Sequence, residues 1–69
     1  MTEIFKTNVE EQLQAETLVA VLCKQFPQFK INFDLDDCDK ILRVEGVHVL
    51  PVRIIELLNA NGYQCLVLE

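Results

Sequence analysis

The sequence predicts an α+β domain in which four antiparallel strands form one sheet and two helices cover one of its faces. Three observations predict this class: two segments repeat apolar residues at helical spacing, others alternate apolar and polar residues, and Pro or Gly stands at segment ends. The chain has 69 residues, of which 51% are hydrophobic and 25% charged. That length and composition are typical of one globular domain, spanning 1–69.

The first two elements are a strand and a helix. Residues 3–8 mix apolar, β-branched and polar side chains and are predicted to form a strand. Residues 12–26 are predicted to form a helix, because apolar residues recur at spacings of three and four: Ala15, Leu18, Val19, Leu22 and Phe26. Asn8 followed three residues later by Glu11 resembles a capping box, which would let this helix begin as early as Val9.

A hairpin follows. Residues 29–35 alternate apolar and polar side chains, as a strand with one buried face does. The aspartate-rich segment 36–39 is typical of a turn, and residues 40–45 are predicted to return as a second strand that Gly46 ends. Two strands with so short a connection pair antiparallel.

The last two elements are a helix and a strand. Pro51 fits the first turn of a helix, whose apolar face is Ile54, Leu57 and Leu58. Gly62 fits the left-handed position that ends a helix, and residues 63–68 are predicted to form the last strand. The order β-α-β-β-α-β with right-handed crossovers predicts a ferredoxin-like sandwich.

The order also predicts which segments meet. The loop after the first strand, the turn 36–39 and the loop around Gly62 should lie at one end of the molecule. That end would hold Glu10, Glu11 and Cys38, with His48 at the opposite end.

Charge and hydropathy exclude two classes of partner. The six Lys and Arg against eleven Asp and Glu give an acidic chain of net charge −5, which argues against nucleic acid. The longest apolar run, residues 18–23, is too short to span a membrane, and no signal peptide is visible near the N-terminus.

The cysteines indicate a reducing compartment. Their odd number prevents a complete set of internal disulfides, and no pair has CxxC spacing, so we expect reduced thiols in a cytoplasmic protein. Cys23 and Cys65 are expected in the core, whereas Cys38 is expected to be exposed in its turn.

Several of these segments are similar to one known family. Leu18 and Leu22 match the core of its first helix. The alternating strand that ends in Asp-Leu is matched by Phe29, Ile31, Phe33, Asp34 and Leu35. The second helix that ends in Gly-Tyr is matched by Ile54, Leu58, Gly62 and Tyr63. The chain therefore resembles the heavy-metal-associated domain of copper chaperones and metal-transporting ATPases, a metallochaperone-like fold that is ferredoxin-like.

The chain departs from this family at the metal site. The family's ligands are the two cysteines of a CxxC motif between the first strand and the first helix. Counting back from Leu22, those positions are Glu11 and Gln14 here. Cu(I) selects soft thiolates, whereas a carboxylate and an amide are hard oxygen donors. We therefore expect a degenerate member without the thiol site and without a cofactor.

An acidic hairpin tip leaves a metal hypothesis open. Glu11 and Cys38, together with this tip, would form a modified metal site; the tip is Asp34, Asp36, Asp37 and Asp39. Hard cations need several converging oxygens, and a charge run at a turn is usually solvated. A metal ion is therefore the alternative rather than the expected partner.

The uncovered face of the sheet is the candidate interaction surface. Either Leu66 and Leu68 or Cys65 and Val67 must point away from the helices. In the first case Ile4 and Ile41 could join Leu66 and Leu68 in a contiguous apolar patch, which would mark an interface; the alternative is a scatter of single exposed residues.

Three functional hypotheses follow. The favoured one is a small non-enzymatic interaction module that binds a protein partner or a second copy of itself. The second is metal binding or transport through the modified site, and the third is a small-molecule regulatory domain that acts as a dimer. No nucleophile elbow, phosphate loop or metalloprotease helix is present in the sequence, so no enzyme activity is predicted.

Overall fold

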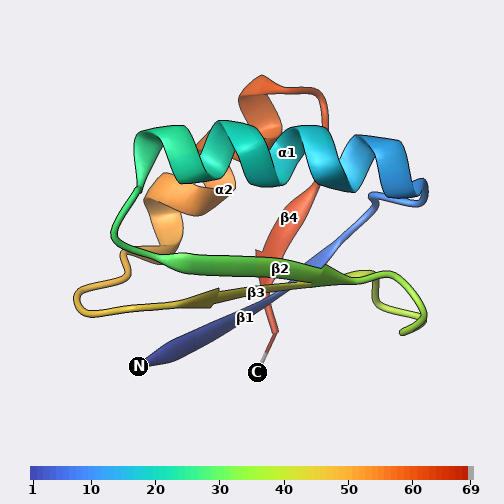
Figure 1. Cartoon of the computed structure of the whole chain (residues 1–69). Helices are drawn as coiled ribbons and strands as arrows, with labels where there is room; N and C mark the ends of the chain where they lie inside the picture. Colours follow the sequence, from blue (N-terminus) through green and yellow to red (C-terminus); the bar gives the residue numbers. More distant parts are fainter. Residues whose placement is uncertain (69) are drawn as a thin grey trace.

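The computed structural model describes residues 1–68 and contains the six elements in the predicted order. The strands are β1 (Thr2–Thr7), β2 (Lys30–Asp34), β3 (Ile41–Glu45) and β4 (Cys65–Val67), and the helices are α1 (Gln12–Gln25) and α2 (Pro51–Ala60). The strands form one antiparallel sheet in the order β2-β3-β1-β4. Both helices lie on the same side of the sheet (Figure 1). The predicted ferredoxin-like α+β fold is confirmed.

The core lies between the helices and the inner face of the sheet. The largest fully buried side chains come from both layers: Phe5, Val9, Leu18, Leu22, Leu42, Val44, Ile54 and Leu58. Phe29 closes the core beside Phe26, with ring centroids 5.5 Å apart. Gly46 follows β3 where a Cβ atom would overlap the Phe29 ring, so only glycine fits there without a shift. Apolar burial of this kind is the main stabilising term in a small domain.

The start of α1 matches the predicted residue 12, and the helix does not extend back to Val9 as the Asn8 box would allow. Glu11 is its N-cap, with a backbone N–H that donates to Oε1 of Gln14 at 3.4 Å. Val9 is fully buried. Asn8 does not cap the helix, because its Oδ1 accepts the N–H of Gln64 at 2.8 Å. The predicted capping box therefore lies about one turn before the observed one, because the Asn8 side chain is used in the contact with Gln64.

The end of α2 follows the predicted glycine. Gly62 has a φ of +91°, and its N–H donates to the carbonyl of Asn59 at 3.0 Å. The N–H of Tyr63 donates to the carbonyl of Leu58 at 3.0 Å. This pair of bonds is the Schellman motif that closes a helix at a left-handed residue. The motif and the Asn8 contact use residues 61–64, so β4 is shorter than the predicted strand 63–68.

The predicted burial is confirmed for two of the three cysteines and is wrong for the third. Cys65 is buried and Cys38 is exposed, as predicted. Cys23 is exposed, so its predicted place in the core was wrong. It follows Leu22 directly, and one residue turns the side chain by about 100° around the helix, away from the buried stripe.

Candidate interaction surface on the open face of the sheet

The strand register decides which side chains face away from the helices. Phe5 of β1 lies opposite Leu42 of β3 and Val67 of β4, and Phe5 and Leu42 are fully buried under the helices. Because side chains alternate along a strand, the residues on either side of these three point to the other face. Of the two registers left open by the sequence, the structure adopts the one in which Leu66 and Leu68 face outward.

The four residues of the predicted surface share this open face. Leu66 lies opposite Lys6, which in turn lies opposite Ile41. The N–H of Leu68 donates to the carbonyl of Ile4 at 2.9 Å, so these two residues are neighbours. No described helix covers this side of the sheet (Figure 1).

The exposure of these residues is unequal. Leu66 is 64% exposed and Leu68 38%, whereas Ile4 is half-buried. Ile41 is only 5% exposed although it lies outside the main core cluster. The accessible apolar surface is therefore Ile4, Leu66 and Leu68, which we call the open-face patch.

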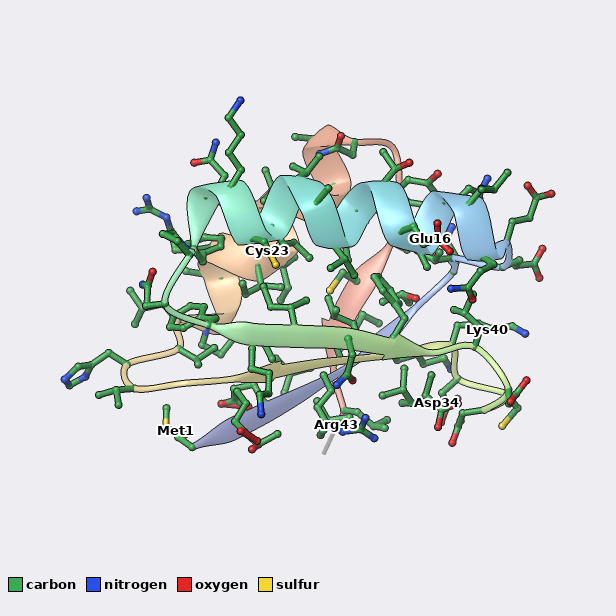
Figure 2. All side chains as sticks on the ribbon, in the orientation of Figure 1. Met1, Glu16, Cys23, Asp34, Lys40 and Arg43 are labelled. Carbon is green, nitrogen blue, oxygen red and sulfur yellow. The ribbon has the colours of Figure 1, made fainter. Side chains whose placement is uncertain are left out.

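The rest of the open face is polar. Arg43 lies on the side of the sheet away from the helices (Figure 2), and its Nη1 donates to Oδ1 of Asn32 at 3.0 Å. Lys30 of β2 lies opposite Glu45 of β3. The open-face patch over β1 and β4 is therefore bordered by Lys6 of β1 and by the polar residues over β2 and β3.

Val67 is a surface residue that the sequence analysis did not select. Its register places it on the inner face, yet it is 39% exposed, because β4 is an edge strand with a neighbouring strand on one side only. A signal was present in the sequence: residues 64–68 contain no charged side chain.

The predicted meeting of three loops at one end is observed. Thr7 joins the end of β1 to the hairpin tip, since its Oγ1 donates to the carbonyl of Lys40 at 2.6 Å and accepts the N–H of Val9 at 3.2 Å. The Asn8 contact with Gln64 brings in the loop after α2. Figure 2 shows Asp34 and Lys40 at this end and Met1 at the other.

The hairpin tip gathers some of the candidate metal ligands. One ligand atom from each of Asp37, Cys38 and Asp39 lies within 4.8 Å of the others, and Glu11 does not belong to this group. Asp37 Oδ1 accepts the N–H of Asp39 at 2.8 Å, and Asp39 lies 3.7 Å from Lys6 Nζ. Both carboxylates therefore already have partners, Asp37 within the turn and Asp39 in β1.

The three thiols differ in accessibility, which predicts a difference in reactivity. Burial raises the pKa of the Cys65 thiol to about 12, whereas Cys23 and Cys38 are exposed. Because the thiolate is the reactive form, Cys65 of the folded protein should resist a disulfide reagent at pH 8. Cys23 and Cys38 should react within minutes, and Cys65 only after urea is added. Fast modification of Cys65 in the native state would contradict the placement of β4.

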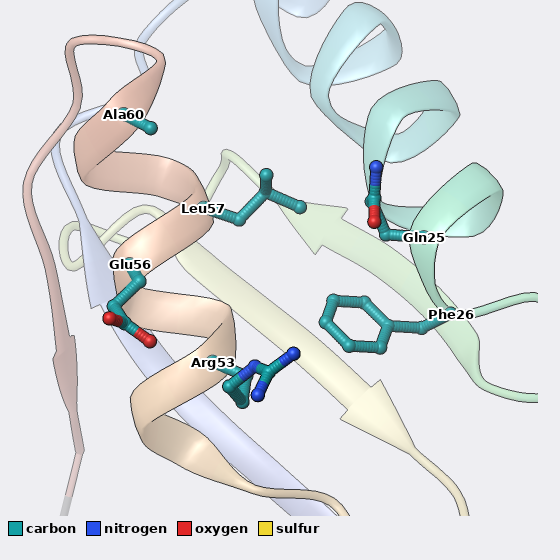
Figure 3. Close-up of a pocket in the computed structure, with 6 residues that line it drawn as sticks. All are labelled: Gln25, Phe26, Arg53, Glu56, Leu57 and Ala60. Atoms are coloured by element: carbon teal, nitrogen blue, oxygen red, sulfur yellow. The ribbon is translucent and has the colours of Figure 1, made fainter.

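A surface groove lies between the helices. It has a volume of about 420 Å³ and is lined by Gln25, Phe26, Arg53, Glu56, Leu57 and Ala60. Figure 3 shows the Arg53 side chain reaching from α2 toward Phe26. Small-molecule sites are usually concave, enclosed and largely apolar. This groove is open and has exposed charged residues along one wall, so it gives the small-molecule hypothesis little support.

Two further findings concern membrane-spanning helices and similarity to known proteins. Within residues 1–68, no helix combines the length and the apolar character that crossing a bilayer requires. No protein-family model matches the chain, and a search of curated proteins finds no significant match.

Proposed function

We propose that this protein is a non-enzymatic interaction module that binds another protein through the open face of its sheet. The observation that carries this proposal is the open-face patch, in which Ile4, Leu66 and Leu68 are neighbours on a face without helices. Single exposed leucines are ordinary on protein surfaces. Neighbouring apolar side chains bordered by polar ones are more typical of an interface.

The proposal includes the heavy-metal-associated-like scaffold and a cytoplasmic location. The positions of the family's thiol ligands hold Glu11 and Gln14, and these two residues form a hydrogen bond at the start of α1. Because these positions cap a helix and carry no thiol, the scaffold is better suited to binding a protein through its surface than to coordinating a metal ion. Three free cysteines support a reducing compartment.

Metal binding is the second candidate function, and the group of Asp37, Cys38 and Asp39 is the observation in its favour. Titration of the reduced protein with Zn²⁺, Ca²⁺ and Cu(I), followed by amide NMR, separates the two. An interaction module should show no shifts at micromolar metal. Saturable shifts confined to residues 8–14 and 36–39 would favour the metal site.

A photo-crosslinking experiment tests the interaction proposal. A benzophenone amino acid replaces Leu66 in one variant and Leu13 in a control, because Leu13 is an exposed leucine of α1 on the helical side of the molecule. Irradiation in the source cells should give a discrete protein adduct from position 66 and none from position 13. Equal adducts from both positions, or none from position 66, would overturn the proposal.

A further inference from the structure

We propose that this chain also pairs with a second copy of itself through the free edge of β4, so that two four-stranded sheets become one continuous sheet. The inference goes beyond the proposed function, because such pairing extends the sheet in its own plane and leaves its open face uncovered. A strand at the edge of a sheet offers unpaired N–H and C=O groups that another strand can bind. Both β2 and β4 are edge strands here, and they differ in how they are protected.

The edge at β2 carries charges and the edge at β4 does not. Lys30 and Asp34 stand at the two ends of β2. Charged side chains on an edge strand discourage pairing with another strand. Residues 64–68, in contrast, are Gln-Cys-Leu-Val-Leu. Around β4, Leu66 is exposed on the open face and Val67 on the helical side. Within residues 64–68 this edge is apolar on both faces and carries no charged side chain that opposes pairing.

The hydrogen bonds of β4 identify which backbone groups are free. The N–H of Leu68 donates to Ile4 of β1, and the N–H of Gln64 donates to Asn8. Backbone groups of successive strand residues point to opposite edges, so residues 64, 66 and 68 face β1. The N–H and C=O groups of Cys65 and Val67 therefore face the free edge.

The backbone groups of Cys65 and Val67 can pair with those of a second copy that is related by a two-fold axis through Leu66. In antiparallel pairing about that axis, Cys65 of each copy exchanges a pair of N–H···O=C bonds with Val67 of the other. Leu66 then lies directly opposite Leu66 of the second copy on the open face. No charged residue meets another within 64–68, so the strand is complementary to itself. The interface is isologous, as a two-fold dimer requires.

The helix layer fits the same arrangement. Packed helices lie about 8–10 Å apart, close to the width of two strands, each about 4.8 Å. Here α1 packs on β2 and α2 packs on β4, so the layer continues across the two-fold axis with the two α2 helices side by side.

The side of α2 that would meet its copy carries two apolar residues beside Asn59. Ile55 is two residues from both Arg53 and Leu57, which line the groove toward α1, so it lies about 160° around the helix from them. Val52 is three residues before Ile55, on the same side, and is 61% exposed. These two side chains of each copy would pack together above the paired β4 strands.

The two-fold position of Leu66 allows a charge-exchange test. Sedimentation equilibrium of the purified, reduced protein should show a monomer–dimer equilibrium. Leu66→Asp and Leu66→Lys should each weaken dimerisation by about tenfold or more, because each places two like charges opposite one another. An equal mixture of the two variants should restore the dimer as a heterodimer. A monomeric wild-type protein at millimolar concentration, or a mixture that stays monomeric, would overturn the proposal.

A proline variant tests the strand edge without disturbing the fold. Val67→Pro removes an N–H that faces the free edge, where proline is tolerated in a sheet. It should abolish the dimer, whereas the matched Val67→Thr variant keeps the N–H and should remain dimeric. Far-UV circular dichroism checks that both variants are folded. A folded Val67→Pro variant that dimerises like wild type would refute the edge pairing.

The failures of the two proposals can be told apart. A chain that is monomeric when pure, yet crosslinks from position 66 to a different protein in cells, refutes the dimer and retains the interaction module. Absence of any adduct from position 66 refutes the interaction module itself.

Discussion

Replacing Phe5 with alanine should destabilise the fold by about 3–5 kcal/mol, the range measured when a buried aromatic side chain is truncated. Phe5 is fully buried in β1, one of the two central strands, between Leu42 and Val67. It contributes to the contact of both neighbouring strands with the helix layer. Small domains have a total stability of roughly 5–15 kcal/mol, so much of the Phe5→Ala protein should be unfolded at moderate temperature.

Urea unfolding followed by circular dichroism measures this loss. Leu13→Ala is the control, because Leu13 is an apolar residue of α1 that is largely exposed. Its truncation should change the free energy of unfolding by no more than about 0.5 kcal/mol. Equal losses for the two variants would mean that Phe5 is not at the centre of the core.

Replacing Thr7 with valine should cost about 1–3 kcal/mol, although the two side chains have nearly the same shape. Thr7 is buried, and its Oγ1 bonds both the carbonyl of Lys40 and the N–H of Val9. Valine preserves the packing of β1 but removes both bonds. The cost arises because the buried N–H of Val9 and the half-buried carbonyl of Lys40 then lack this partner, after losing bonds to water on folding.

Hydrogen exchange distinguishes this effect from a general loss of stability. In Thr7→Val, the amide of Val9 should exchange faster than amides of α2, because its acceptor has been removed. Thr17→Val is the matched control, since the Oγ1 of Thr17 donates to the carbonyl of Leu13 on an exposed helix surface. Unfolding free energies that agree for the two threonine variants would contradict the role given to Thr7.

Together these residues relate the stability of the fold to its surfaces. Phe5 and Thr7 point inward from β1, and Ile4 and Lys6, which alternate with them, point outward. The residues that hold β1 in register therefore also place Ile4 beside Leu68 on the open face. A change that shifted β1 by one residue would turn Ile4 inward and Phe5 outward, which would disrupt both the open-face patch and the core.

Local patterns in the sequence were sufficient for most of the secondary structure. The repeat of Leu18 and Leu22, Pro51 at the start of α2 and the left-handed Gly62 at its end each act within a few residues. Helical periodicity, a fixed φ angle and a positive φ angle are properties of a short segment. The element order then restricted the topology, because right-handed crossovers leave few ways to build this sheet.

Other features depended on contacts between distant segments. The role of Asn8 was decided by Gln64, which lies 56 residues away, and the exposure of Val67 was decided by its place in an edge strand. The sequence by itself determined the helices, the strands and their order, because these follow from short-range periodicity and backbone preference. Only the tertiary structure decided that Leu66 and Leu68 rather than Cys65 and Val67 face outward, because strand register is set by pairing between segments far apart in the chain.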